Sequence, residues 1–232
     1  MKTYIWASPM RLFHWFLFLS VVCAYILGEE DELLNIHAAF GYIAVILLLF
    51  RIVYGFTGPR YSRFKDFPVK ISTIRTYLGN IKNDKQNFAG HNPASAVIML
   101  AILADVLLVG ASGILALAAK GFGPLKGFVQ QSNSEFFKES HEIFVNLLIT
   151  LVIIHLAGLV VDFYNNRKAG TIKSIFTGYK NVDGESIKES RTLNVFMAIV
   201  IVAAISVFTI TARANYSDGE DREHYKEIED ED

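Results

Sequence analysis

Two histidines stand near the two ends of one apolar stretch, where imidazoles are uncommon. His141 and His155 are fourteen residues apart in the segment from Ser140 to Gly158. On an α-helix, fourteen residues make almost four turns, so both side chains point within about 40° of one direction and lie about 21 Å apart along the axis. Ionisable side chains inside membrane-spanning segments are rare and usually functional. Because imidazole nitrogens bind haem iron and zinc, this spacing indicates a metal or haem site at each end of one helix face.

The helices that must position these side chains are visible as apolar blocks. The chain has 232 residues, 52% of them hydrophobic, and a mean hydropathy of +0.34. The blocks are about 17–25 residues long, the length that crosses the hydrocarbon core of a bilayer. The first block has no small-residue cleavage site, so we expect it to be retained as a helix. We predict an all-α integral membrane protein with five spans, at Leu12–Gly28, Ile36–Phe56, Pro93–Ala118, His141–Tyr164 and Leu193–Ala212.

The charged residues between the blocks predict the orientation of the chain. The connection of residues 51–90 has eight bases and two acids, and that of residues 165–192 has six bases and three acids. Residues 29–35 have four acids and no base, and the tail after Ala212 is strongly acidic. Lys and Arg are enriched on the cytoplasmic side of membrane proteins. We therefore expect a protein of the bacterial inner membrane with its N-terminus in the cytoplasm and its C-terminus in the periplasm.

With this topology, the depths of four histidines follow. His14 lies near the cytoplasmic end of the first span, and His155 lies two-thirds of the way along the fourth span toward the same face. His37 and His141 both begin their spans at the periplasmic face. Two imidazoles bind one haem iron from opposite sides only at a common depth, so the expected pairs are His14 with His155 and His37 with His141. The shared face of His141 and His155 then aligns two haems as a short path for electrons.

Other interpretations of these histidines are open. A single histidine in a membrane is often a hydrogen-bonded packing residue, although two matched pairs are harder to explain in this way. Zinc would need further Cys, Asp or Glu ligands at close spacing, which neither pair has. A haem supplies four iron ligands itself, so two histidines complete its coordination. Cys23 is the single cysteine, which excludes an intrachain disulfide and a C-x-x-C-H attachment site for c-type haem.

Two arginines lie where they would contact haem propionates. Arg11 is one turn before His14, and Arg51 is fourteen residues after His37 on nearly the same helix face. A guanidinium group pairs well with a carboxylate. Both residues are equally suited to anchor their helices at the cytoplasmic face.

Further polar and small residues accompany these positions. Asp105 is an acid in the middle of the third span, and it is a candidate hydrogen-bonding or proton-handling group. His91 precedes an Asn-Pro pair that is typical of a helix start, and we expect a structural or interfacial role for it. Glycines that leave space for a flat macrocycle, or for ordinary helix packing, occur at Gly41, Gly110, Gly113 and Gly158.

Several motifs resemble those of the bacterial cytochrome b561 family. They are RLFHW in the first span, HAAFGY and FRIVYGFTGPRYSRF in and after the second, and GHNPAS before the third. The family includes the cytochrome b subunits of nickel-iron hydrogenases, and two histidines fourteen apart on one helix are also similar to the cytochrome b subunit of respiratory formate dehydrogenase. The resemblance covers about residues 1–180. It implies a four-helix bundle with two non-covalent haem b groups, bound at His14, His37, His141 and His155, and a quinone as a candidate ligand.

We therefore predict a dihaem cytochrome b domain in residues 1–180, a fifth transmembrane helix in residues 181–212 and an acidic periplasmic tail in residues 213–232. The expected function is electron transfer across the inner membrane, as a respiratory-chain subunit, between the quinone pool and a periplasmic redox partner. That partner is expected to be a hydrogenase-like enzyme or a c-type cytochrome. One alternative is a stand-alone quinone oxidoreductase that reacts with a small periplasmic oxidant. The other is a membrane transporter or anchor without haem. The basic connections are explained by topology, so no nucleic-acid partner is expected.

Overall fold

The computed structural model describes the backbone of residues 1–28, 31–80 and 88–230. Side chains are described in the same ranges, except for Asp31 and the residues after Arg213. The acidic side chains of the predicted tail therefore lie outside the described residues. The same holds for part of the charge pattern that predicts the orientation, namely Glu29, Glu30, Asp31, Lys82, Asp84 and Lys85.

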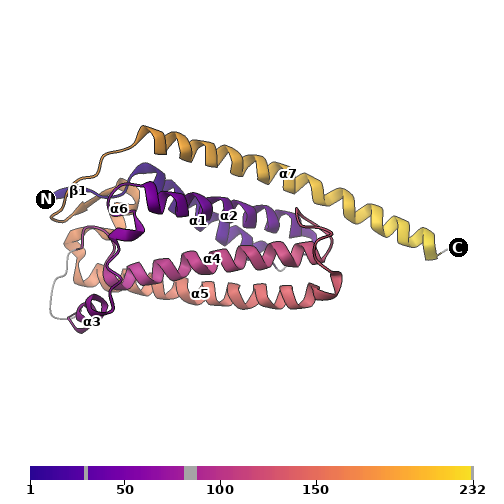
Figure 1. Ribbon diagram of the computed structural model, residues 1–232, viewed down its shortest axis with the longest axis horizontal. Helices are drawn as coiled ribbons and strands as arrows, with labels where there is room; N and C mark the ends of the chain where they lie inside the picture. The colour runs from indigo at the N-terminus through magenta and orange to yellow at the C-terminus, as the bar shows by residue number, and fades with distance from the viewer. Residues whose placement is uncertain (29–30, 81–87, 231–232) are drawn as a thin grey trace.

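Long helices make up most of the described chain (Figure 1). Five of its helices are long and apolar enough to cross a membrane, which confirms the prediction of an all-α membrane protein. The fifth such segment is the Arg191–Arg213 part of the last helix. The α-helices are α1 Ser8–Leu27, α2 Leu34–Thr57, α3 Ile71–Gly79, α4 Pro93–Ala119, α5 Ser134–Asn165, α6 Thr171–Thr177 and α7 Arg191–Asp230. The short 3₁₀ turns are η1 Asp31–Leu33, η2 Phe64–Asp66, η3 Gln131–Asn133 and η4 Arg167–Ala169.

Several helices extend beyond the apolar blocks that predict them. The helix α1 begins at Ser8 with a proline in its first turn, and α5 begins at Ser134, before the apolar block that starts at His141. In contrast, α4 begins at Pro93 as predicted, where the Asn92 side chain accepts a hydrogen bond of 2.8 Å from the Ser95 amide. Hydrophobicity marks the length that lipid surrounds, whereas caps and backbone hydrogen bonds set where a helix ends.

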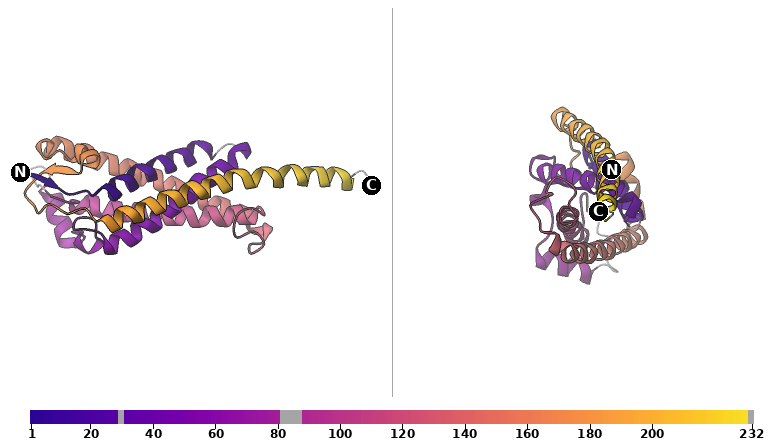
Figure 2. Two further views of the ribbon diagram at one scale, coloured as in Figure 1. Left: turned by 90° about the horizontal axis from the view of Figure 1, so that it is seen from above. Right: turned by 90° about the vertical axis from the view of Figure 1, so that its right-hand side faces the viewer.

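The spans form a bundle in which α2 is the central element. It packs against α1, α4 and α7, and α4 packs along α5 (Figures 1 and 2). The buried core of the bundle consists of Met10, Phe13, Leu47, Leu48, Phe50, Tyr54, Leu103, Val106, Leu148, Met197 and Val200. Large apolar side chains also point outward, as at Ile153 and Ile154 on α5. Such an apolar exterior is expected where lipid replaces water as the solvent.

A small sheet closes one end of the bundle, which we call the sheet end. The strands β1 (Lys2–Tyr4) and β2 (Tyr179–Asn181) pair antiparallel, with Thr3 opposite Lys180. The Thr3 hydroxyl donates to the Val182 carbonyl at 2.6 Å. The opposite end, which we call the far end, carries the α1–α2 and α4–α5 connections, and α7 extends beyond it (Figure 1). The sheet therefore joins the N-terminus to the segment between α6 and α7.

Polar contacts fasten the same segment to neighbouring elements at the sheet end. Glu189 accepts hydrogen bonds from the Tyr4 hydroxyl, from the Ser8 amide at 2.7 Å and from the Asn194 side chain at 2.9 Å. Burial raises the pKa of Glu189, but hydrogen bonds from Tyr4, Asn194 and Ser8 outweigh burial and lower the pKa to about 2. Glu189 therefore ties β1, α1 and α7 together as a carboxylate.

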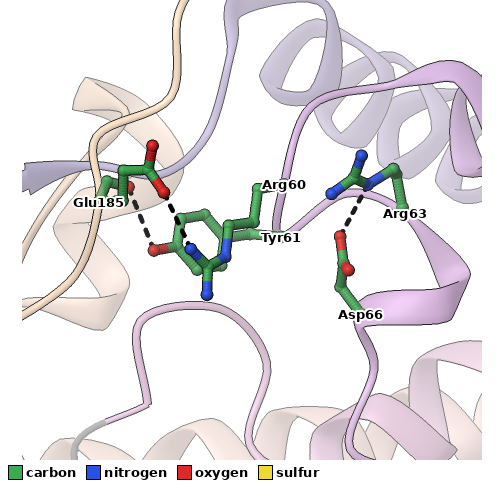
Figure 3. A network of polar contacts seen from close by, with 5 residues as sticks. All are labelled: Arg60, Tyr61, Arg63, Asp66 and Glu185. Atoms are coloured by element: carbon green, nitrogen blue, oxygen red, sulfur yellow. Dashed lines mark hydrogen bonds and ion pairs between the residues drawn. The ribbon is translucent and has the colours of Figure 1, made fainter.

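The loop after α2 is fastened to the same segment. Arg60 lies 3.0 Å from a carboxylate oxygen of Glu185, and the Tyr61 hydroxyl donates to the Glu185 carbonyl at 3.1 Å (Figure 3). In the same loop, Arg63 pairs with Asp66 at 2.8 Å across the turn η2 (Figure 3). These contacts fix the loop that covers the sheet end of α2.

Candidate functional site

The structure brings the rings of His37 and His141 together at the far end of the bundle. His37 lies in the first turn of α2 and His141 lies on α5. Their ring centroids are 6.0 Å apart, and the ring planes are 84° to one another. Each ring therefore comes from a different helix, at a common depth. We call these residues the far-end pair.

Both rings of the far-end pair are held by the neighbouring helix. His37 Nδ1 lies 2.8 Å from the Ala24 carbonyl of α1, and His141 Nδ1 lies 3.0 Å from the Val109 carbonyl of α4. The Ser112 hydroxyl is also 3.2 Å from His141 Nδ1. A carbonyl only accepts, so Nδ1 carries the proton in each ring and Nε2 keeps its lone pair. This arrangement orients an imidazole that binds a metal through Nε2.

Glycines let the helices approach these rings. A Cβ at Gly113 on α4 would lie 2.9 Å from His141 Cε1, closer than a carbon atom allows. A Cβ at Gly28 would lie 3.2 Å from His37 Nδ1. Gly41, one turn along α2 from His37, has nothing within 4 Å of the position that a Cβ would take. The first two glycines thus make room for the histidines, while the third borders open space.

His14 and His155 lie nearer the sheet end, on α1 and α5. The two rings are near enough that a charge on one would be felt by the other. His14 Nδ1 is buried and has no hydrogen-bond partner among the described residues. Gly158, three residues after His155, has no atom within 4 Å of an added Cβ. The second pair, which we call the sheet-end pair, is thus less tightly fixed than the far-end pair.

The two predicted propionate partners differ in their surroundings. Arg11 donates to the Phe176 carbonyl, and its other terminal nitrogen lies 3.0 Å from the Ser8 hydroxyl. Arg51 is 1% exposed, and its Nε and Nη1 have no partner among the described residues. Both terminal nitrogens of Arg11 are thus engaged, and only its Nε is buried without a partner, whereas Arg51 has two such nitrogens.

Several residues outside the predicted ligand set have unsatisfied polar atoms in buried positions, among them Asp105 and His91. Asp105 on α4 is 2% exposed, and neither carboxylate oxygen has a partner in the described part of the chain. His91 packs its ring against Trp6 and Phe67, at centroid distances of 4.9 and 5.0 Å. Burial, and then the positive charges of Arg51 and Lys180, lower the pKa of His91 to about 3. The sequence motif GHNPAS contains His91, but only its surroundings show that this residue is enclosed.

The donor set fits a haem. Among the described residues, no group of three or more His, Cys, Asp or Glu side chains comes together as a metal site would require. A haem iron needs only two protein ligands, since the porphyrin supplies four. At the far end, two Nδ1-anchored imidazoles and open space beside Gly41 suit a flat macrocycle of this kind. At the sheet end, the buried Arg51 without a counter-ion suits its carboxylates.

Comparison with known proteins agrees with this chemistry. Residues 5–178 match the family described as prokaryotic cytochrome b561. No curated protein matches the chain, and no solved structure does. The match includes the first four candidate spans and all four histidines of the two pairs. The chain therefore belongs to the prokaryotic cytochrome b561 family, whose members are multi-pass membrane proteins that bind haem b and transfer electrons.

Proposed function

We propose that this cytochrome binds two haem b groups and carries electrons across the bacterial inner membrane. The far-end pair His37 and His141 would bind one haem iron, and the sheet-end pair His14 and His155 the other. Arg51, with Arg11 as a second candidate, would contact propionates. The observation that carries the proposal is the far-end pair, because its two rings are each held through Nδ1 by a different neighbouring helix.

The spacing of the pairs supports a path across the membrane. His141 and His155 share α5 and stand about 21 Å apart along its axis. When bound, haem b supplies a one-electron carrier at each of these depths. The chain holds the imidazoles, and the buried core around Leu47, Leu103 and Leu148 excludes water between the pairs. A preorganised, dry surrounding of this kind tunes a haem potential through burial and hydrogen bonding.

The two ends of the path would meet different partners. We propose that the sheet end faces the cytoplasm and the far end the periplasm, as the Lys and Arg distribution predicts. A periplasmic redox protein, either a hydrogenase-like enzyme or a c-type cytochrome, would then exchange electrons at the far end. Membrane quinone would be the second partner. The acidic sequence after Ala212 would attract a basic partner electrostatically.

The first experiment is a visible spectrum of the purified protein, oxidised and then reduced, with a pyridine haemochrome assay. We expect two non-covalent haem b groups per chain, with the bands of six-coordinate low-spin iron. One haem per chain would contradict the dihaem arrangement. A protein without haem after expression with ample haem supply would refute the proposed function and favour an anchor or transporter.

Electron transfer across the membrane is tested in proteoliposomes. Ferricyanide is enclosed in the vesicles and a quinol is added outside. We expect reduction of the enclosed ferricyanide by the wild type, and only the leak of empty vesicles in His37→Ala and His155→Ala. The matched control is His224→Ala, which removes a histidine from outside the candidate spans. Equal rates in all three variants would contradict a path through the two pairs.

A further inference from the structure

Three buried nitrogen-bearing side chains, two of them cationic, lie together at the sheet end of the bundle. They are Arg51, His91 and Lys180, and we call them the cationic cluster. Arg51 is 1% exposed and Lys180 is 6% exposed. Lys180 Nζ donates to the Phe88 carbonyl at 2.7 Å, which satisfies one of its three donors. His91 Nδ1 is buried without a partner in the described residues.

Aromatic rings and a thioether surround the cluster. The Arg51 guanidinium lies 4.6 Å from the centre of the Phe64 ring and 5.9 Å from that of Phe67. His91 contacts the same Phe67 ring, so Arg51 and His91 both border it. Arg51 Nη2 also donates a weak hydrogen bond to Met99 Sδ at 3.8 Å. None of these neighbours offers the full negative charge that a buried guanidinium needs.

No described carboxylate pairs with the cluster. Among the residues that the structure describes, Arg51, His91 and Lys180 form no ion pair. Asp162 is near enough for its charge to act on Lys180. Its Oδ1 accepts from the Asn166 side chain at 3.1 Å, and its Oδ2 has no hydrogen-bond partner among the described residues, so Asp162 contributes negative charge beside Lys180 but makes no direct contact with Arg51 or His91. An isolated cation buried in a membrane protein is costly unless an anion compensates it. The cluster therefore calls for an anionic ligand.

The cluster lies beside the sheet-end pair. Arg51 and His155 each follow a member of the far-end pair by fourteen residues, which places both about 21 Å toward the sheet end. Arg51 and His91 both border the Phe67 ring, so His91 lies at the same end. His91 precedes α4 and is thus nearer the sheet end than either histidine of the pair. An anion held here would belong to a molecule bound between His14 and His155.

We propose that Arg51 and His91 bind the propionate carboxylates of the sheet-end haem b, with Arg51 as the ionic partner and the His91 ring as a hydrogen-bond donor. This inference rests on the proposed function, since it requires a haem at the sheet-end pair. Haem b carries two propionates, so it offers the carboxylate oxygens that the unused Nε and Nη1 of Arg51 and the Nδ1 of His91 require. Lys180 adds positive potential at the same end.

The test is potentiometric titration of each haem in the purified protein. Arg51→Gln removes a positive charge that favours the ferrous state, so the potential of the sheet-end haem should fall. We expect at least a tenfold change in the redox equilibrium, or about 59 mV for one electron. His91→Phe keeps the ring packing against Trp6 and Phe67 but removes the hydrogen-bond donor. The potential of the sheet-end haem should fall in this variant as well. His91→Gln restores a donor and should recover most of the loss.

The matched control is Lys65→Gln, which removes an exposed positive charge from the same end, within the turn η2. It should leave both potentials nearly unchanged. Shifts in Arg51→Gln and His91→Phe no larger than in Lys65→Gln, with two haems still bound, would overturn the inference. If Arg51→Gln does not fold, the comparison of His91→Phe, His91→Gln and Lys65→Gln decides the question.

A second measurement identifies the carboxylates themselves. The apoprotein is reconstituted with haem b whose propionates are methyl esters. We expect the effect of His91→Phe on potential to shrink, because the ester carries no negative charge for the His91 donor, whereas the direct effect of the Arg51 charge on the haem should persist. An effect of His91→Phe that is as large with the ester as with haem b would show that His91 does not act through a propionate and would overturn the inference. A wild type that retains no ordinary haem b as purified would instead refute the proposed function, so the two failures are distinct.

Discussion

The far-end pair is fixed by contacts that no single helix supplies. His37 is held by a carbonyl of α1 and His141 by a carbonyl and a hydroxyl group of α4. Each imidazole is thus held in one tautomer and one direction, as the proposed binding of a haem iron would require. Preorganisation of this kind raises the affinity of a site, because less freedom is lost on binding.

The pairing of the histidines predicts which variants lose the same haem. His37→Ala and His141→Ala should each remove the far-end haem, and His14→Ala and His155→Ala the sheet-end haem. Redox titration of the four purified variants checks this pairing, because each variant should lose one of the two haem midpoint potentials. Loss of the same haem in His37→Ala and His155→Ala would contradict the pairing.

A glycine variant tests the position of the His141 ring. In Gly113→Ala the new Cβ would lie 2.9 Å from Cε1 and 3.1 Å from Nδ1 of His141, so the ring must move. We expect about tenfold weaker haem binding or more at the far end, as when a supporting contact of a ligand is lost. The affinity is measured from the haem content that remains after dialysis against apomyoglobin, which removes weakly bound haem.

The control for this variant lies one turn away on the same helix. In Gly110→Ala the Cβ would meet Val45 at 2.5 Å, which strains the packing of α4 on α2 without touching a histidine. It should lower thermal stability but keep the relative occupancy of the two haems. Equal loss of far-end haem in both variants would assign the effect to helix packing.

At the scale of elements, the segment between α6 and α7 holds the sheet end together. Its Glu189 binds groups from β1, α1 and α7 as a carboxylate. The pKa of this group is lowered from 4.5 to about 2, so the ionised form stabilises the fold. This contribution is complete above about pH 4.5 and is lost as the pH falls toward about 2.

Glu189→Gln should therefore reduce the thermal stability of the protein in detergent at about pH 7, and the difference from the wild type should shrink between about pH 4.5 and the acid limit. Glu185→Gln is the matched control, because its ion pair with Arg60 is exposed and contributes little. A difference for Glu189→Gln that does not change with pH would show that its charge is irrelevant.

The whole molecule presents two unlike ends. The sheet end carries β1, β2, α3 and α6, whereas α7 extends alone past the far end (Figure 1). The helix α7 also packs along α2 within the bundle, and the Asn35 side chain donates to the Ala212 carbonyl at 3.1 Å. Its membrane-spanning part is therefore integrated into the fold, while its C-terminal part extends beyond the far end (Figure 1).

Orientation is the prediction that belongs to this scale. Alkaline phosphatase, which is active only in the periplasm, should be active when fused after Asp232 and inactive when fused after Asn80 at the end of α3. A green fluorescent protein at the same two positions should show the reverse pattern. Activity of the phosphatase at Asn80 alone would place the sheet end in the periplasm and reverse the proposed partners.

Much of the architecture was predictable because its signals are local. The length of an apolar block predicts a span, and α4 begins at Pro93 because the Asn-Pro pair both caps and starts a helix. Family membership, which the motifs indicate, is confirmed by the match over residues 5–178. The haem-free transporter loses support for the same reason, since the family binds haem b. The depths of His37 and His141 follow from counting residues along two spans.

Tertiary structure decided what lies beside each of these residues. The pairing of β1 with β2, the anchoring of each far-end ring by a neighbouring helix and the engagement of Arg11 all join segments that are far apart in the sequence. So does the enclosure of His91 between Trp6 and Phe67. A sequence determines how deep a side chain lies because the helix rise is constant and lipid selects apolar length. It does not by itself determine which neighbour a side chain meets, because that depends on how whole helices pack around one another.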